Sequence, residues 1–152
     1  MAHIKFCAQA NLLNRVRPST DNMEEVWNAL KVLIVPSLWF EAWGIVITEA
    51  QLRGIPVISS NAGGIPEAKL GVPYIVPVAP LTGEQSAPNQ YVVKDQDIKP
   101  WQEALERLMT NPEEYKRISK LARQKTIEWL KEIGEDAQEQ WLVSLQENKK
   151  IR

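Results

Sequence analysis

Three short apolar runs leave this chain few folds to adopt: they lie at Val32–Val35, Pro56–Ile58 and Tyr74–Val78. Apolar runs without polar alternation are typical of parallel strands that helices cover on both faces. Between the first two runs lies Ile45–Leu52, and Gly54 follows it as a plausible helix stop. This strand, helix, strand order predicts a three-layer, doubly wound α/β sheet of the Rossmann type.

Further helices are expected on either side of this unit. Asp21 and Glu24 have the spacing of a capping box, and apolar residues recur at helical period after them, which predicts a helix at residues 22–31. Residues 81–90 are rich in Gly, Ser, Pro and Asn, so we expect a surface loop there. Pro100 suits the first turn of another helix.

The last 60 residues carry most of the charge. Residues 1–92 hold 6 basic and 7 acidic side chains, whereas residues 93–152 hold 12 of each. We interpret this change as a passage from an α/β core to solvated C-terminal helices within one domain of residues 1–152. There, Asn111 and Glu114 have the positions of a helix cap and its capping-box acid. Trp129 and Trp141 either pack in the core or brace another domain.

Charge and composition exclude several kinds of partner. The formal net charge of −1 gives no field that would attract nucleic acid or an anionic membrane surface. No apolar run approaches the roughly 20 residues of a membrane span. Cys7 is the single cysteine, so an internal disulfide is impossible. The sequence is therefore typical of a cytoplasmic protein with a small-molecule ligand.

Two carboxylates follow the first predicted strand. Ligands of doubly wound sheets bind at the carboxyl ends of the strands, and here such an end leads through Gly44 into a helix. The backbone amides around Trp43, Gly44 and Ile45 are therefore candidates for contact with a diphosphate or with sugar oxygens. Glu41 and Glu49 are candidates for accepting hydrogen bonds from sugar hydroxyls.

Each of these acids also has a plainer interpretation. Glu49 has apolar neighbours in sequence, so a buried, unpaired carboxylate there would be unfavourable and would need a partner. Arg53, four residues later, could supply one as a helical ion pair. Glu41 alone could be a solvated loop acid. The Gly63 and Gly64 pair after the second strand permits a close backbone approach to a ligand, or forms only a tight turn.

Taken together, these residues resemble the family-4, or group 1, retaining glycosyltransferases. The matching motifs are Pro36-Ser37, Glu41 and Glu49 with Trp43-Gly44 between them, Gly54-Ile55-Pro56-Val57-Ile58, and Gly63-Gly64-Ile65-Pro66-Glu67. The resemblance is dense over residues 21–78. It implies the C-terminal half of a GT-B fold that binds a nucleotide-diphosphate sugar, with no cofactor and no metal.

The resemblance also assigns roles to residues. Glu41 would be the catalytic residue against the transferred sugar, Trp43, Gly44 and Ile45 would contact sugar and phosphates, and Glu49 the ribose hydroxyls. Only 40 residues precede Glu41, so we expect the cations that neutralise the diphosphate and the N-terminal acceptor domain to lie outside this sequence. The chain alone is then expected to be inactive. The donor sugar, its base, the acceptor and the roles of Arg15 and Arg17 stay open.

Other functions remain possible at this point. The chain could be a noncatalytic nucleotide-sugar-binding or interaction module, or a fragment of an epimerase or phosphorylase with the GT-B fold. By the same resemblance the strand at residues 32–35 would lack its inner neighbour, so its edge would be open. We expect either that two copies of the chain form a homodimer through this edge, or that residues 4–6 of the same chain fold back and cover it.

Overall fold

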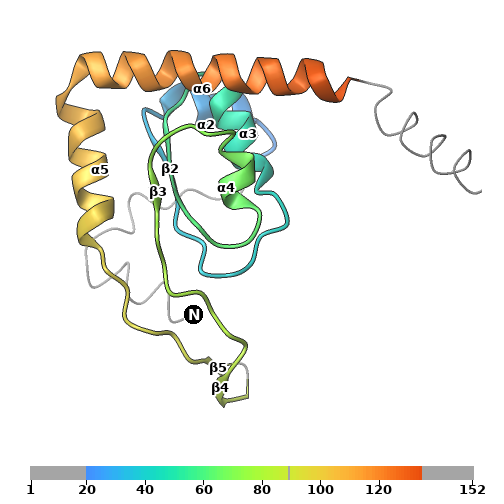
Figure 1. The fold of residues 1–152 in the computed structure, drawn as a ribbon, viewed down its shortest axis with the longest axis vertical. Coiled ribbons are helices and arrows are strands. Elements are labelled where there is room, and N and C mark those ends of the chain that lie inside the picture. Colours follow the sequence, from blue (N-terminus) through green and yellow to red (C-terminus); the bar gives the residue numbers. More distant parts are fainter. Residues whose placement is uncertain (1–19, 89, 135–152) are drawn as a thin grey trace, which may run out of the picture.

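A parallel three-stranded sheet forms the centre of the molecule. The computed structural model describes residues 20–88 and 90–134 (Figure 1). Its strands are β1 (Leu33–Val35), β2 (Val57–Ser60) and β3 (Ile75–Val76), in the order β1-β2-β3. Leu33 pairs with Val57, and Ser59 pairs with Ile75. All three predicted strands are thus confirmed, and so is the parallel α/β arrangement.

One face of the sheet is covered by the helices that come before and between the strands. These are α2 (Met23–Ala29), α3 (Ile45–Leu52) and the short α4 (Ile65–Ala68). Trp27 of α2, Ile47 of α3 and Ile65 of α4 are buried against the side chains that β1 and β2 present on this face. Because α3 is fixed in this core, the position of its amino terminus beyond the end of β1 is fixed too.

The opposite face is covered by the two C-terminal helices, α5 (Lys99–Thr110) and α6 (Pro112–Ile133). Leu108 of α5 and Ile118 of α6 are fully buried against Ile58 of the central strand. The long α6 also packs against α3 and spans the end of the molecule (Figure 1). Each of these helices buries an apolar stripe and keeps its charged side chains on the solvated face.

The helix caps predicted from the sequence are confirmed only in part. The residue before α6 is Asn111, and its side chain accepts a hydrogen bond from the Glu114 N–H at 3.0 Å, as predicted. The Glu114 carboxylate does not close a capping box, since it accepts from Tyr74 and Arg117 instead. Asn22 rather than Asp21 precedes α2, and it makes no side-chain cap. The capping box predicted there is wrong.

A small hairpin replaces part of the predicted surface loop at residues 81–90. Its strands are β4 (Gln85–Ala87) and β5 (Gln90–Tyr91), which pair antiparallel. The Gln96 side chain holds the base of this segment, because it bonds both the N–H and the carbonyl of Ala79. The segment lies at the surface, as predicted, but it is ordered by strand pairing.

Some predicted features fall outside the described residues: Cys7, Arg15, Arg17 and Trp141. Within residues 20–88 and 90–134, no helix has the length and apolar character needed to cross a membrane.

Candidate functional site

The loop that leaves β1 places Glu41 at the carboxyl end of the sheet. The Glu41 side chain is exposed, and its Oε1 accepts a hydrogen bond from the Ser37 hydroxyl at 3.0 Å. Gly44 ends the loop with a φ of 82°, a left-handed conformation that favours glycine, and α3 starts at the next residue. Helix α3 thus begins four residues after Glu41, and the first amides of a helix lack acceptors in the preceding turn, so they can donate to an anion.

The glycine loop after β2 lies directly against this first loop. Glu41 and Gly63 form a parallel backbone bridge, and the Gly64 N–H donates to the Glu41 carbonyl at 2.8 Å. A Cβ on Gly63 would lie 2.4 Å from the Glu41 carbonyl oxygen, and one on Gly64 2.2 Å from that of Ala42. The close approach expected for these glycines is present. Its partner, however, is the backbone of the Glu41 loop.

A further contact joins the second and third strand ends. The Asn61 side-chain oxygen accepts from the Val78 N–H at 2.9 Å. Ser60, at the end of β2, is fully buried, and its hydroxyl has no hydrogen-bond partner among the described residues. Three consecutive strand ends thus meet at one edge, with Glu41 on the outside.

Trp43 is held from two sides. Its indole N–H donates to the Thr48 hydroxyl at 2.9 Å. Its ring stacks on Trp129 of α6, with centroids 4.9 Å apart and planes 16° from parallel. Sequence patterns did not reveal this pair, because the two residues are far apart in the chain. Of the two expectations for Trp129, the structure supports packing within this domain.

Glu49 is exposed, contrary to the expectation that its apolar neighbours bury it. The side chains that α3 buries include Ile47 and Ala50, which point to the sheet, whereas Glu49 lies on the opposite face. Arg53 does not pair with the Glu49 carboxylate. It donates to the Glu49 backbone carbonyl and forms an ion pair with Glu24 at 2.5 Å.

The groups of this candidate site are therefore suited to bind hydroxyls and phosphates. Glu41 and Glu49 present exposed carboxylates that accept hydrogen bonds, and the start of α3 presents donors. Within the described ranges, no three residues of the types that ligate metals come close enough to hold an ion.

The groups with shifted pKa values lie elsewhere. Burial lowers the pKa of Lys69 to about 7, and its ammonium donates to the Val57 carbonyl at the start of β2. The Arg117 hydrogen bond and the Tyr74 hydroxyl lower the pKa of Glu114 to about 2. These groups sit toward the amino ends of the strands, so we assign them to the framework.

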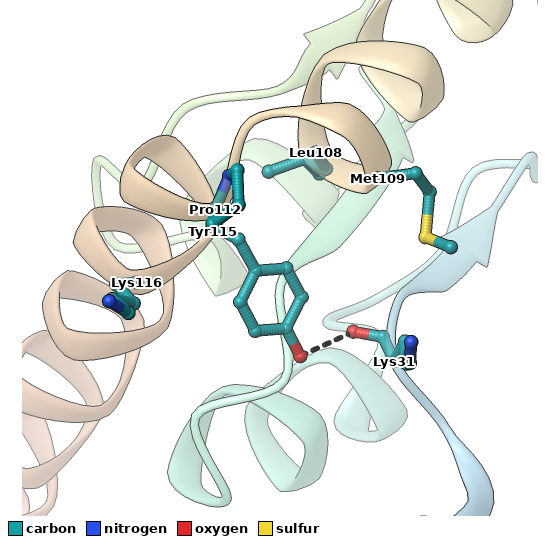
Figure 2. A pocket seen from close by; sticks show the side chains of 6 residues that line it. All are labelled: Lys31, Leu108, Met109, Pro112, Tyr115 and Lys116. Atoms are coloured by element: carbon teal, nitrogen blue, oxygen red, sulfur yellow. Dashed lines mark hydrogen bonds between the residues drawn. The ribbon is translucent and has the colours of Figure 1, made fainter.

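A pocket of about 400 Å³ also opens at the amino end of β1 (Figure 2). It lies between Lys31, the end of α5 and the start of α6, and the Tyr115 hydroxyl donates to the Lys31 carbonyl there at 2.9 Å. Lys31 precedes β1, whereas Glu41 follows it. This pocket is therefore at the end of the sheet opposite to the candidate site.

Comparison with known proteins gives a consistent family match. Residues 8–125 match the family model described as glycosyl transferases group 1. A D-inositol 3-phosphate glycosyltransferase of Mycolicibacterium vanbaalenii is 36% identical over 69 residues, which are 43% of this chain and 15% of that protein. One of Corynebacterium diphtheriae is 29% identical over 111 residues, 70% of this chain and 22% of that protein.

A third relative is an uncharacterized 41.2 kDa protein in the cps region of Klebsiella pneumoniae. It is 53% identical over 36 residues, which are 24% of this chain and 10% of that protein. The matched stretches span at most 22% of the length of these three relatives.

Proposed function

Because the chain belongs to the group 1 glycosyltransferase family, we propose that it is the donor-binding part of a hexosyltransferase that uses a nucleotide-diphosphate sugar. The observation that carries the proposal is the bridge between Glu41 and Gly63. It brings the Glu41 loop and the Gly63-Gly64 loop together at the carboxyl ends of adjacent strands, where sheets of this type bind their ligands.

In this proposal each part of the site has one task. The Glu41 carboxylate accepts hydrogen bonds from hydroxyls of the transferred sugar, and its contact with Ser37 limits its rotation. The amides from Trp43 to Ile45 donate to the sugar and the phosphates, helped by the positive end of the α3 dipole. Glu49, exposed on the same helix, accepts from the ribose hydroxyls. The glycine loop keeps the Glu41 backbone in place.

The remaining expectations complete this proposal. Transfer would retain the anomeric configuration, need no metal and take place in the cytoplasm, within a GT-B enzyme whose other domain binds the acceptor. Without the cations that neutralise the leaving diphosphate, this chain should bind donor weakly and transfer nothing by itself, because charge stabilisation of a leaving group contributes several kcal/mol.

Titration calorimetry with UDP-, GDP- and ADP-glucose tests the proposal. We expect weak binding of one of these donors and about tenfold weaker binding by Glu49→Ala, because a hydrogen bond to a charged acceptor is lost. Glu132→Ala, which removes an exposed glutamate from α6, is the matched control and should bind like wild type. Equal affinities for wild type and Glu49→Ala would remove Glu49 from the site.

A further inference from the structure

The chain that leaves β3 crosses the carboxyl ends of the three strands. It does so in residues 78–81, called here the strap. The Val78 N–H donates at 2.9 Å to the side-chain oxygen of Asn61, which follows β2. The Leu81 N–H donates at 2.9 Å to the carbonyl of Leu38, in the loop that follows β1. The strap therefore runs from the end of β3, past the end of β2, to the loop after β1.

Every backbone N–H of the strap has a partner. A segment outside a sheet lacks the hydrogen bonds that a neighbouring strand would supply to its N–H and C=O groups. Gln96 replaces such a strand, because its amide accepts from the Ala79 N–H and donates to the Ala79 carbonyl, both at 3.0 Å. Pro80 has no N–H. Together with the contacts of Val78 and Leu81, all the donors of the strap are thus bonded.

Gln96 also closes the part of the chain that contains the hairpin. It lies between β5 and α5, and its Nε2 donates to the Lys94 carbonyl at 2.8 Å as well as to Ala79. The amide therefore joins the two ends of residues 79–96, called here the hairpin segment. Because this segment begins within the strap, Gln96 fixes both of them.

The hairpin segment contacts the Glu41 loop at a second point. The ring of Tyr91, in β5, meets that of Trp39 edge to face, with centroids 5.6 Å apart. Both contacted residues, Leu38 and Trp39, lie just before Glu41. The Ser37 hydroxyl, one residue before Leu38, donates to the Glu41 carboxylate at 3.0 Å. A shift of the hairpin segment would therefore move the residues that orient this carboxylate.

The Glu41 loop is held at both of its ends. The glycine loop holds its later part, because the Gly64 N–H donates to the Glu41 carbonyl. The strap holds its earlier part at Leu38, and the strap is fixed in turn by Gln96. A residue that is distant in sequence thus supports the loop that carries the proposed donor contact.

We propose that Gln96 is a positioning residue for donor binding, an inference that rests on the proposed function. Its amide fixes the strap, the strap fixes the start of the Glu41 loop, and the loop presents the Glu41 carboxylate to the transferred sugar. Gln96 acts through these backbone contacts and needs no contact with the donor.

Amide NMR spectra of the full chain test the support of the loop without any ligand. We expect Gln96→Ala to shift the signals of the Leu81 amide and the Trp39 indole. Gln96→Met, which keeps the size of the side chain and removes its hydrogen bonds, should shift them as well. Gln102→Ala is the matched control, because it removes an exposed glutamine that bonds Glu106 on the surface of α5, and it should leave both signals unchanged.

Titration calorimetry with UDP-, GDP- and ADP-glucose tests the effect on donor binding. We expect Gln96→Ala and Gln96→Met to bind the donor about fivefold more weakly than wild type, because the hydrogen bonds that hold the strap are lost. In a chain that already carries Glu41→Ala, Gln96→Ala should weaken binding no further, because Gln96 acts through the Glu41 carboxylate. Gln102→Ala should leave the affinity unchanged in both backgrounds.

The two measurements separate this role from the proposed function. Unchanged Leu81 and Trp39 signals in Gln96→Ala would overturn the support of the loop, whether or not a donor binds. Equal donor affinity in wild type and Gln96→Ala, or the same loss with and without Glu41, would overturn the positioning role. A wild-type chain that binds none of the three donors, with shifted signals in Gln96→Ala, would refute the proposed function and leave Gln96 a purely structural residue.

Discussion

Gly64 has no room for a side chain, although its backbone conformation is ordinary. With a φ of −80° it could hold any residue, but an added Cβ would lie 2.2 Å from the Ala42 carbonyl oxygen. Such a clash involves two backbones and cannot be relieved by rotating a side chain. The two site loops can therefore meet only through glycine, and their separation should change when Gly64 is replaced.

We expect Gly64→Ala to lower the free energy of unfolding by roughly 2–3 kcal/mol, because it overpacks a fixed contact. Gly71→Ala is the control: it adds a methyl group in open space, at a φ of 78°, and should lose about 1 kcal/mol from backbone strain alone. Urea unfolding measures both. If folded Gly64→Ala protein matched Gly71→Ala in stability and bound donor normally, the glycine loop would be only a spacer.

Lys69 links stability to pH. Burial lowers its pKa from 10.5 to about 7 in the folded chain. Between these values the unfolded chain holds a proton that the folded chain has released, so the free energy of unfolding should rise with pH from about 7 to 10. The expected slope is about 1.4 kcal/mol per pH unit at most.

Urea unfolding at pH 7 and pH 9 measures this slope. Lys69→Met, which keeps the length of the apolar stem, should remove the Lys69 contribution, whereas Lys120→Met on the exposed side of α6 should keep it. The same pH dependence in wild type and Lys69→Met would show that Lys69 stays charged when folded.

At the level of elements, local patterns predicted the strands and α3 well. The apolar runs at β1 and β2 are short and bounded by Pro36 and Gly54, and β2 is buried on both faces, so few other structures suit them. The exposure of Glu49 was mispredicted because its sequence neighbours are apolar all around, and only the packing of α3 on the sheet decides which side is buried.

The long-range contacts of the site could not be predicted in the same way. Neither periodicity nor capping signals indicate that Arg53 reaches Glu24, or that Trp43 stacks on Trp129, because each pair joins separate elements. The motif residues Glu41, Gly44 and Gly63 were identifiable from sequence. The contact of their loops with each other and with α6 required the fold.

Helix α6 should support the site loop through its Trp129. We expect Trp129→Ala to lower the free energy of unfolding by roughly 2 kcal/mol and to weaken donor binding several-fold, because the stack that orients Trp43 is lost. Trp129→Phe should restore most donor affinity. Near-ultraviolet circular dichroism should show the loss of the coupled indoles in both variants.

The control for this prediction is the adjacent, more exposed side chain of α6, through Leu130→Ala. It should leave donor affinity and the aromatic spectrum unchanged. If Trp129→Ala lowered stability but left donor affinity equal to that of Leu130→Ala, α6 would stabilise the domain without positioning the site.

At the scale of the whole molecule, one edge of the sheet is open within residues 20–88 and 90–134. Among the described residues, β1 pairs with β2 alone, and Ile34 at its centre is 42% exposed. Next to it lies an apolar pocket of about 290 Å³ that Ile98 and Trp101 line from the α5 side. An open strand edge with apolar side chains recruits another strand.

We therefore propose that the chain associates with a second copy through β1. A two-fold axis brings two identical edges together antiparallel, so a dimer needs no further sequence. Sedimentation equilibrium at micromolar concentration should then give a mass near twice 17.3 kDa for wild type. Ile34→Glu should shift it to the monomer, because a charge would be buried in the contact, whereas Ile133→Glu on α6 should stay dimeric. A mass of 17.3 kDa at every concentration would contradict the dimer and favour a cover from residues 4–6 of the same chain.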